Sequence, residues 1–174
     1  MYELLMSLLK IMAPLLAVTA DEAWEHVKIS RKSESVHLED WPKDNFDKWH
    51  NAALDDKWAL LAALREAVLK KLEEKRQAGD IGSGLEARVV LSAQDAKFKK
   101  LLNENKGELR YIFIVSEVDI SGAGAGELEA NIPVAIRVEK ARGVKCQRCW
   151  NYSEEVGRDN THPTLCERCV KAVS

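Results

Sequence analysis

The feature that most constrains this chain is the arrangement of its cysteines. Only four occur among 174 residues, as Cys146-Gln-Arg-Cys149 and, after an interval of 16 residues, Cys166-Glu-Arg-Cys169. Each pair places two thiolates on one tight turn, and two such turns that face each other offer four sulfur ligands in a tetrahedron. Zinc prefers this donor set and this geometry. The spacing therefore predicts a zinc site with the ligands Cys146, Cys149, Cys166 and Cys169.

Two disulfides, or four unrelated buried thiols, are the alternatives to a metal site. Disulfide frameworks are typical of small secreted domains rich in cysteine, whereas this chain has no cysteine outside the two pairs and no secretory signal pattern. The metal site is therefore favoured. Four protein thiolates leave no position for water, so a structural and not a catalytic site is expected. The polar loop between the pairs cannot fold alone, so metal binding and folding of residues 143–174 should be coupled.

Composition and charge place few limits on function. The chain is 46% hydrophobic and 31% charged, with a net charge of −2, which is ordinary for a soluble globular protein. No apolar run is long enough for a transmembrane helix. Residues 140–174 hold seven Lys/Arg and four Asp/Glu. Because four thiolates on Zn²⁺ would subtract two charges from this excess, bulk charge alone will not supply affinity for a nucleic acid.

Helices are predicted in the first half of the chain. Residues 1–12 carry leucines at helical spacing, and Pro14 should end that helix. Thr19-Ala-Asp-Glu22 has the form of a capping box, which predicts that a short helix begins there, and residues 35–42 should be an extended connector. The longest predicted helix covers residues 49–77. Its polar face carries basic residues that are candidates for nucleic-acid contact or for plain solvation: Arg65, Lys70, Lys71, Lys75 and Arg76.

After Gly79, which should end the long helix, the pattern changes to alternating and β-branched residues. A short helix is expected after Ser92-Ala-Gln-Asp95, read as its cap. Gly122-Ala-Gly-Ala-Gly126 lacks the lysine and the following helix of a phosphate-binding loop, so a hairpin connection is expected. Strands are predicted at three places, residues 85–91, 109–118 and 132–138.

Several stretches resemble one family. Met12-Ala-Pro-Leu-Leu-Ala-Val-Thr-Ala-Asp-Glu-Ala-Trp24 and residues 35–42 resemble the anticodon-binding helical domain of the class I aminoacyl-tRNA synthetases for branched aliphatic amino acids. Arg65-Glu-Ala-Val68 and Ile81-Gly-Ser-Gly-Leu-Glu-Ala87 resemble that family's crossing into its C-terminal region. A tetra-cysteine module with Trp150 after the second cysteine is similar to the end of bacterial-type isoleucyl-tRNA synthetases.

The resemblance implies an α+β fold in three parts. Residues 1–78 are expected to form a helical anticodon-binding segment, truncated from a larger bundle. Residues 79–142 are expected to form a small α+β junction unit, and residues 143–174 a zinc-binding module. In the family, the helical domain and the zinc-bearing end grip the anticodon stem-loop of the tRNA.

The resemblance also implies what the chain lacks. His-x-Gly-His and Lys-Met-Ser-Lys-Ser, the two motifs that handle ATP in this class, are absent from the sequence. We therefore expect the C-terminal part of such a synthetase, with one structural zinc and no catalytic centre, and with ATP used only in the missing part. The parent protein is expected to be a cytoplasmic monomer that binds tRNA and neither a membrane nor DNA.

Candidate RNA contacts follow from the chemistry of single-stranded loops, whose bases stack on aromatic rings and on guanidinium planes. Local packing or solvation is the alternative for each candidate. Two positions depart from the family pattern: Asp80 stands where a lysine is common, and Gly84 where a serine is frequent. The candidates are Arg148, Trp150, Tyr152, Arg158, Arg168, Arg65, Lys75 and Arg76.

Two other classes of protein remain as alternatives. A DNA-repair glycosylase carries a C-terminal zinc finger of very similar cysteine spacing, but such enzymes use an N-terminal proline and this chain starts Met1-Tyr2-Glu3. A free-standing zinc-ribbon interaction protein is the third possibility. The uncapped start of the first helix argues against it, because a natural N-terminus would normally be capped.

Overall fold

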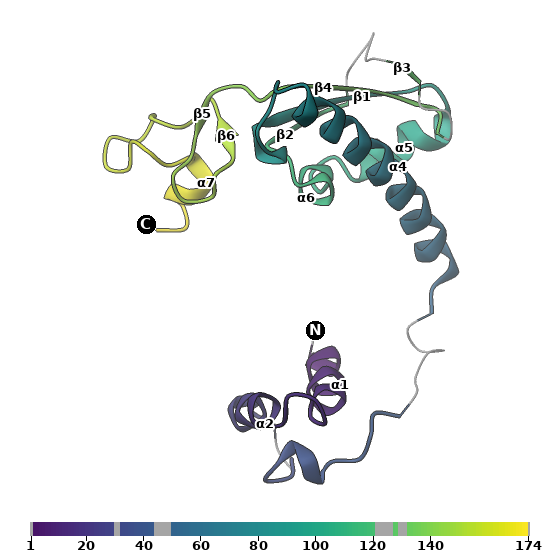
Figure 1. Ribbon diagram of the computed structural model, residues 1–174, viewed down its shortest axis with the longest axis vertical. Coiled ribbons are helices and arrows are strands. Elements are labelled where there is room, and N and C mark those ends of the chain that lie inside the picture. Colours follow the sequence, from purple (N-terminus) through teal and green to yellow (C-terminus); the bar gives the residue numbers. More distant parts are fainter. Residues whose placement is uncertain (1, 30–31, 44–49, 121–126, 129–131, 174) are drawn as a thin grey trace. The chain divides into compact units, whose positions relative to one another are not determined.

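The computed structural model describes residues 2–29, 32–43, 50–120, 127–128 and 132–173 (Figure 1). The chain forms two compact units, Met1–Asn51 and Ala52–Ser174, each of which is described by itself. The long helix belongs to the second unit, so the boundary between the compact units precedes it and does not fall at residue 78. The division into three functional parts stays a prediction.

The first unit is helical. Its elements are α1 (Tyr2–Met12), α2 (Ala17–His26) and the 3-10 turn η1 (Val36–Leu38). Pro14 lies in the turn between the two helices, as expected. The unit packs around Trp24, whose side chain is fully buried and whose Nε1 donates a hydrogen bond to a backbone carbonyl at 2.9 Å. Its other buried apolar residues are Leu9, Ala13, Ala20, Val27 and Val36.

Two local expectations for this unit are wrong. The helix begins at Ala17 with no side-chain cap, so Thr19 lies inside it and the proposed capping box does not mark its start. The connector is not fully extended, because Ser35 caps the turn η1 within it. The Asp21 carboxylate accepts hydrogen bonds from Ser35 Oγ at 2.6 Å and from the Val36 amide at 2.9 Å. These bonds hold the connector against α2, which the sequence pattern did not indicate.

The second unit contains a four-stranded sheet with the order β2-β1-β4-β3. β1 pairs with β4 in antiparallel fashion along seven residues and with β2 in parallel. The expected α+β class is confirmed, and the strands predicted at residues 85–91 and 132–138 are present with boundaries shifted by about two residues. The strands are β1 (Ala87–Ala93), β2 (Glu117–Asp119), β3 (Glu127–Leu128) and β4 (Val134–Lys140).

Three helices cover one face of this sheet: α4 (Ala52–Gln77), α5 (Ala96–Glu104) and α6 (Leu109–Phe113). Figure 1 shows all three on the same side of β1 and β4. Because side chains alternate along a strand, one set from each central strand enters this core. From the two strands these are Ala87, Val89, Leu91, Val134, Ile136 and Val138.

The opposite face of the sheet carries charge. Arg88 lies between three carboxylates, within 3.2 Å of Glu117, 2.5 Å of Asp119 and 3.1 Å of Glu139. Arg137 pairs with Glu139 at 2.9 Å on the same face. The Nε of Arg88 is buried and has no hydrogen bond of good geometry, although a Glu117 oxygen lies within ion-pair distance. Within the described residues, charge pairing of Arg88 and Arg137 therefore covers part of this face of the sheet.

The predicted strand over residues 109–118 is wrong. Leu109–Phe113 is the short helix α6, and Ile114 ends it in the left-handed region with φ 58°. Leu109 and Phe113 are four residues apart, so they lie on the same face of a helix, and both are buried in the core. Only the end of the predicted segment becomes a strand, β2. The run of apolar residues is compatible with the periodicity of a helix and with that of a strand, and packing against the sheet favours the helix.

Two of the remaining expectations concern the ends of helices α4 and α5. The long helix begins at Ala52, and Gly79 ends it with φ +79°. Asp95 and not Ser92 caps α5, accepting a hydrogen bond from the Phe98 amide at 2.7 Å. Residues 122–126 lie outside the described residues. Among the described residues, none of the helices combines the length and the apolar character needed to cross a bilayer.

Gly84 provides a test of how α6 packs. It lies in the 3-10 turn η2 (Gly84–Glu86), and a Cβ at this position would approach the backbone oxygen of Ile114 to 2.9 Å. Gly84→Ala should therefore lower the free energy of unfolding of the second unit by about 1–3 kcal/mol, since the backbone must move. Urea unfolding measures the change. Gly107→Ala is the matched control, because a Cβ there meets nothing within 4 Å. Equal stability of the two variants would contradict the packing described.

Candidate metal centre

The cysteines lie on two short elements that follow β4. Strands β5 (Val144–Lys145) and β6 (Tyr152–Ser153) form an antiparallel hairpin, and the first cysteine pair lies in its turn. The helix α7 (Glu167–Val170) carries the second pair, with Cys166 at its N-cap position and Cys169 inside it. Figure 1 shows the hairpin and α7 side by side. The turn is closed by two backbone bonds, Cys146 N to Asn151 O and Trp150 N to Cys146 O, both 2.9 Å.

The four sulfur atoms fit a tetrahedral zinc ion. All four lie within 4.8 Å of one another, and the Sγ atoms of Cys149 and Cys166 are 3.7 Å apart. Zinc at about 2.3 Å from four tetrahedral sulfurs sets sulfur–sulfur distances of roughly 3.8 Å. Cys146, Cys166 and Cys169 are buried and Cys149 is half-buried. The donor set, its spacing and its burial therefore match a closed structural zinc site.

Donors around the cluster favour thiolates. The Cys166 amide donates to the Sγ of Cys146 at 3.3 Å. Burial opposes ionisation of Cys149, but hydrogen bonds from Asn151 outweigh it and lower the pKa of that thiol to about 6. Burial, with the neighbouring sulfurs, raises the pKa of the Cys166 thiol. Four adjacent thiols cannot all ionise unaided, whereas a bound zinc ion stabilises all four thiolates.

Two arginines cross between the cysteine pairs. Arg148, which precedes Cys149, donates from Nη1 to the Sγ of Cys169 at 3.8 Å. Arg168, which precedes Cys169, interacts in turn with the thiol of Cys149. Zinc with four thiolates carries a net charge of −2, so the two guanidinium groups offset that charge. In both Arg-Cys motifs, therefore, the arginine interacts with a cysteine of the opposite pair.

The metal module is attached to the sheet unit through Ser116. Its Oγ donates to the Leu85 carbonyl at 2.5 Å and accepts from the Tyr152 amide at 2.7 Å. An ion pair between Arg142 and Glu117 lies beside this junction. The hydroxyl of one buried serine thus joins the start of β1 to the zinc-side hairpin, and residues 143–173 are in contact with the sheet unit.

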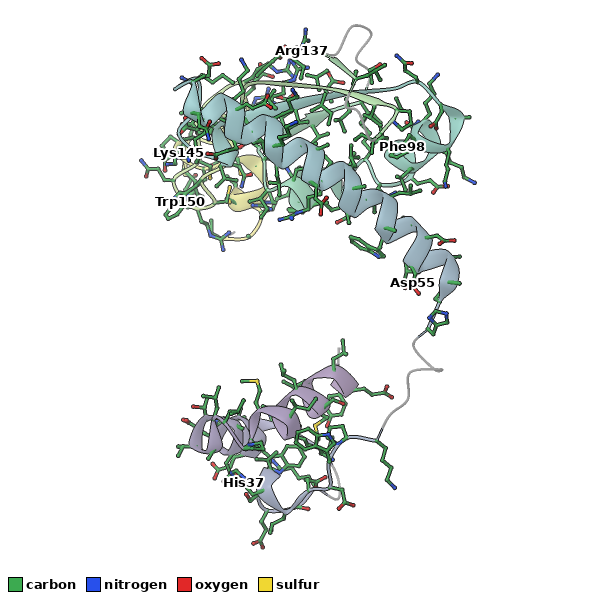
Figure 2. The ribbon with its side chains drawn as sticks, turned by 45° about the vertical axis from the view of Figure 1, so that its right-hand side comes forward. His37, Asp55, Phe98, Arg137, Lys145 and Trp150 are labelled. Atoms are coloured by element: carbon green, nitrogen blue, oxygen red, sulfur yellow. The ribbon has the colours of Figure 1, made fainter. Side chains whose placement is uncertain are left out.

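Trp150 does not cover the metal. Its side chain is 61% exposed, and the Lys145 ammonium lies 5.6 Å from the ring centroid. Both residues lie on the metal module in Figure 2. The backbone of Trp150 has φ +63°, a conformation that is unusual for a bulky residue. The sequence left open whether this ring covers the metal or offers a stacking face, and the exposed ring is available for stacking.

The predicted RNA contacts on α4 already have partners within the chain. Arg65 Nε donates to the Ile112 carbonyl at 3.0 Å, which ties α4 to α6. Lys75 pairs with Asp80 at 2.8 Å, so the departure at residue 80 provides a local ion pair. Arg76 makes two hydrogen bonds to a glutamate one turn earlier. Eleven residues separate Arg65 from Arg76, which is roughly 16 Å along a helix, so these residues do not form one cluster.

The candidates on the metal module are closer together. Arg158 is largely exposed and lies 3.8 Å from Glu155. Arg168 and Arg158 both line a cavity of about 300 Å³ between α6 and the metal module. Tyr152, half-buried, lines the same cavity. The structure therefore brings three of the predicted residues to one hollow.

Sequence reasoning missed Arg110, which lines this cavity, and its neighbour Tyr111. Arg110 donates to the Tyr111 hydroxyl at 2.5 Å, and Arg168 donates to the same oxygen at 3.3 Å. These two guanidinium groups, Arg110 most strongly, hold the pKa of Tyr111 below its usual value. The incorrect strand assignment concealed the pair, because a strand would point the two side chains to opposite faces. The five-residue Leu-Arg-Tyr-Ile-Phe segment carried no other signal.

Comparisons with known proteins agree with this architecture. Residues 1–91 match the family described as the anticodon-binding domain of tRNA ligase, and residues 143–172 match one described as a zinc finger found in FPG and IleRS. The second match and the four neighbouring cysteines fit one structural zinc.

Curated relatives agree along the entire chain. The chain is 41% identical to an isoleucine–tRNA ligase of Gloeobacter violaceus, over 100% of this chain and 18% of that protein. It is 44% identical to one of Geobacter sulfurreducens, over 99% and 19%, and 40% identical to one of Thermotoga neapolitana, over 98% and 18%. The chain therefore spans about a fifth of the length of these relatives. The expected resemblance to isoleucyl-tRNA synthetases is confirmed.

The crossing arginines yield a testable prediction about metal retention. Arg148→Ala leaves all four cysteines but removes the positive charge beside Cys169. Loss of such an outer partner typically costs 10–100-fold in metal affinity, so zinc transfer to a chromogenic chelator should accelerate about tenfold. Arg158→Ala removes an exposed arginine of the same module that pairs with Glu155 and should release zinc at the unaltered rate. Identical release from both variants would show that Arg148 does not stabilise the centre.

Proposed function

The chain belongs to the family of anticodon-binding domains of tRNA ligases, and from this premise we propose that it is the tRNA-binding part of an isoleucine–tRNA ligase. The observation that supports the proposal is the presence of two matches on one chain, an anticodon-binding domain followed by the zinc finger shared with IleRS. The ATP-dependent attachment of isoleucine to its tRNA is proposed for the whole ligase. The 174 residues themselves lack both ATP motifs and contribute recognition of the anticodon stem-loop.

The zinc centre is proposed to be ligated by Cys146, Cys149, Cys166 and Cys169. Its role is structural: the closed thiolate shell offers no position for a reacting water. Zinc fixes the hairpin of β5 and β6 against α7, and this arrangement presents Trp150 and Arg158 to solvent. A metal that rigidifies these turns lowers the entropy that their side chains lose on binding RNA.

Trp150 is proposed as a stacking face for an unpaired base. Its ring is exposed, and an adjacent ammonium from Lys145 can approach the phosphate of the stacked nucleotide. Base–aromatic stacking contributes about 1–3 kcal/mol per base. The other candidates are proposed to contribute positive charge or hydrogen bonds, for which those on α4 would have to exchange their partners within the chain: Arg148, Tyr152, Arg158, Arg168, Arg65, Lys75 and Arg76.

The alternatives have less support. A DNA-repair glycosylase shares a related zinc finger, but residues 1–91 match a domain of tRNA ligases. If the chain were a free-standing zinc-ribbon protein, the match of residues 1–91 would be unexplained. We further propose that the parent ligase is a monomer and that it is cytoplasmic, because its tRNA substrate is used in translation there.

The first prediction of this proposal concerns zinc. Protein purified without chelator should hold one zinc per chain by elemental analysis. Cys146→Ser should lose it and unfold residues 143–173, since binding and folding are coupled. Amide resonances of β1 and β4 should persist, because their core lies under α4, while Ser116 and its neighbours should shift. A chelator-treated sample of the unaltered chain is the control, and its amide spectrum should match that of Cys146→Ser. Full zinc content in Cys146→Ser would rule out this ligand set.

The second prediction concerns tRNA. The zinc-loaded chain should bind an isoleucine tRNA transcript, measured by fluorescence anisotropy, more tightly than a tRNA with another anticodon. Trp150→Ala should weaken binding by roughly 5- to 100-fold, the equivalent of one stacked base. Trp150→Phe keeps an aromatic face and should retain most of the affinity. If the chain binds neither tRNA, or binds both equally, the proposed recognition of the anticodon stem-loop is wrong.

A further inference from the structure

An uncompensated group of donors lies where α6 meets the metal module. The exposed side chain of Tyr111 accepts hydrogen bonds from Arg110 and Arg168, and the Arg110 guanidinium lies 4.6 Å from the Tyr111 ring centroid. In the part of the chain that the structure describes, neither arginine forms an ion pair with a carboxylate. Two positive groups thus contact one phenol, and both arginines line the cavity of about 300 Å³.

The phenol is left with a free donor. A tyrosine hydroxyl has one O–H and two acceptor lone pairs, and the two arginines donate to that oxygen. Its hydrogen must therefore point to another acceptor. Among the described residues there is no such acceptor for Tyr111. Because Tyr111 is exposed, its O–H is available to an acceptor from outside the chain, next to the two guanidinium groups.

The charge balance singles out Arg110. Two other arginines that line the cavity are paired, Arg142 with Glu117 and Arg158 with Glu155. Arg168 shares its charge with the Cys149 thiolate of the zinc centre. Arg110 has the Tyr111 hydroxyl as its hydrogen-bond partner and, within the described part of the chain, forms no ion pair, although Glu117, Glu154 and Glu155 line the same cavity. An anion at this point would meet a guanidinium that no described carboxylate pairs with directly.

We propose that Arg110 and Tyr111 form a binding site for a backbone phosphodiester of tRNA, with Arg168 orienting the phenol. This inference rests on the proposed tRNA binding and adds to it a site on α6, outside the zinc finger and the helical segment. A guanidinium presents a planar fork of N–H groups that suits two phosphate oxygens. The Tyr111 O–H adds a third donor. Such a contact fixes the position of the RNA and reads no base.

Two local features fix the helix that carries this site. Ile114 ends α6 at φ 58°, which is strained for a β-branched residue, and Gly84 leaves room for its carbonyl. This ending lets the chain turn at once into β2. Arg65 of α4 donates a hydrogen bond to the Ile112 carbonyl and so holds α6 against α4. Arg110 and Tyr111 are therefore carried by a short helix that is fixed at its C-terminal end.

The test measures tRNA affinity of the zinc-loaded 174-residue chain as a function of salt. Arg110→Gln should weaken binding about tenfold at 0.1 M salt and reduce the log–log salt slope by about one, because one phosphate contact is lost. Tyr111→Phe should weaken binding about fivefold and leave the slope unchanged, because a neutral donor is removed. Arg110→Lys should restore the slope but not the full affinity, since the fork is lost.

Arg137→Gln is the matched control. Arg137 is half exposed and pairs with Glu139 on the charged face of the sheet (Figure 2), so its loss should leave affinity and slope unchanged. Zinc content and amide spectra establish that each variant is folded. Phosphate ethylation interference should identify one phosphate whose modification blocks the unaltered chain but has no further effect on Arg110→Gln.

The outcomes separate this inference from the broader proposal. If the unaltered chain fails to bind tRNA, both are wrong. If it binds tRNA and Arg110→Gln matches Arg137→Gln in affinity and slope, only the phosphodiester site is wrong.

Discussion

Burial of one face of the four-stranded sheet positions every functional group of the second unit. α4 covers β1 and β4, and Phe113 and Leu109 pack α6 into the same core. Ser116 then follows directly from that core and joins the hairpin that carries the first cysteine pair. The metal module has a core of only three cysteines with a few partly buried neighbours, so its orientation depends on the sheet to which it is attached.

The sequence predicted best what depends on local spacing. Two Cys-x-x-Cys motifs specify four ligands wherever they lie in a fold, and the Gly79 end of the long helix is a property of one backbone position. The segment over residues 109–118 went wrong because its apolar run suits a strand or a helix, and only packing of Leu109 and Phe113 decides. The Arg110–Tyr111 pair was invisible for the same reason.

Arginine has three different roles in the second unit, which residue type alone does not distinguish. Arg148 stabilises thiolate charge across the metal site, and Arg88 is held by three carboxylates on the open face of the sheet. Arg110 forms no ion pair among the described residues. Of these three arginines, the sequence named only Arg148 as a candidate for RNA contact. What distinguishes the arginines is whether a carboxylate or thiolate from a distant part of the sequence already pairs with the guanidinium.

The left-handed backbone of Trp150 has a consequence for how this region can change. A glycine at that position would relieve a strain on the order of 1–3 kcal/mol, and the exposed ring makes little packing contact that would be lost. If the ring stacks on a base as proposed, stability and recognition therefore favour different residues at this position. Selection for thermal resistance alone would favour losing the ring, and under the proposed stacking role such a variant would fold better and bind RNA less tightly.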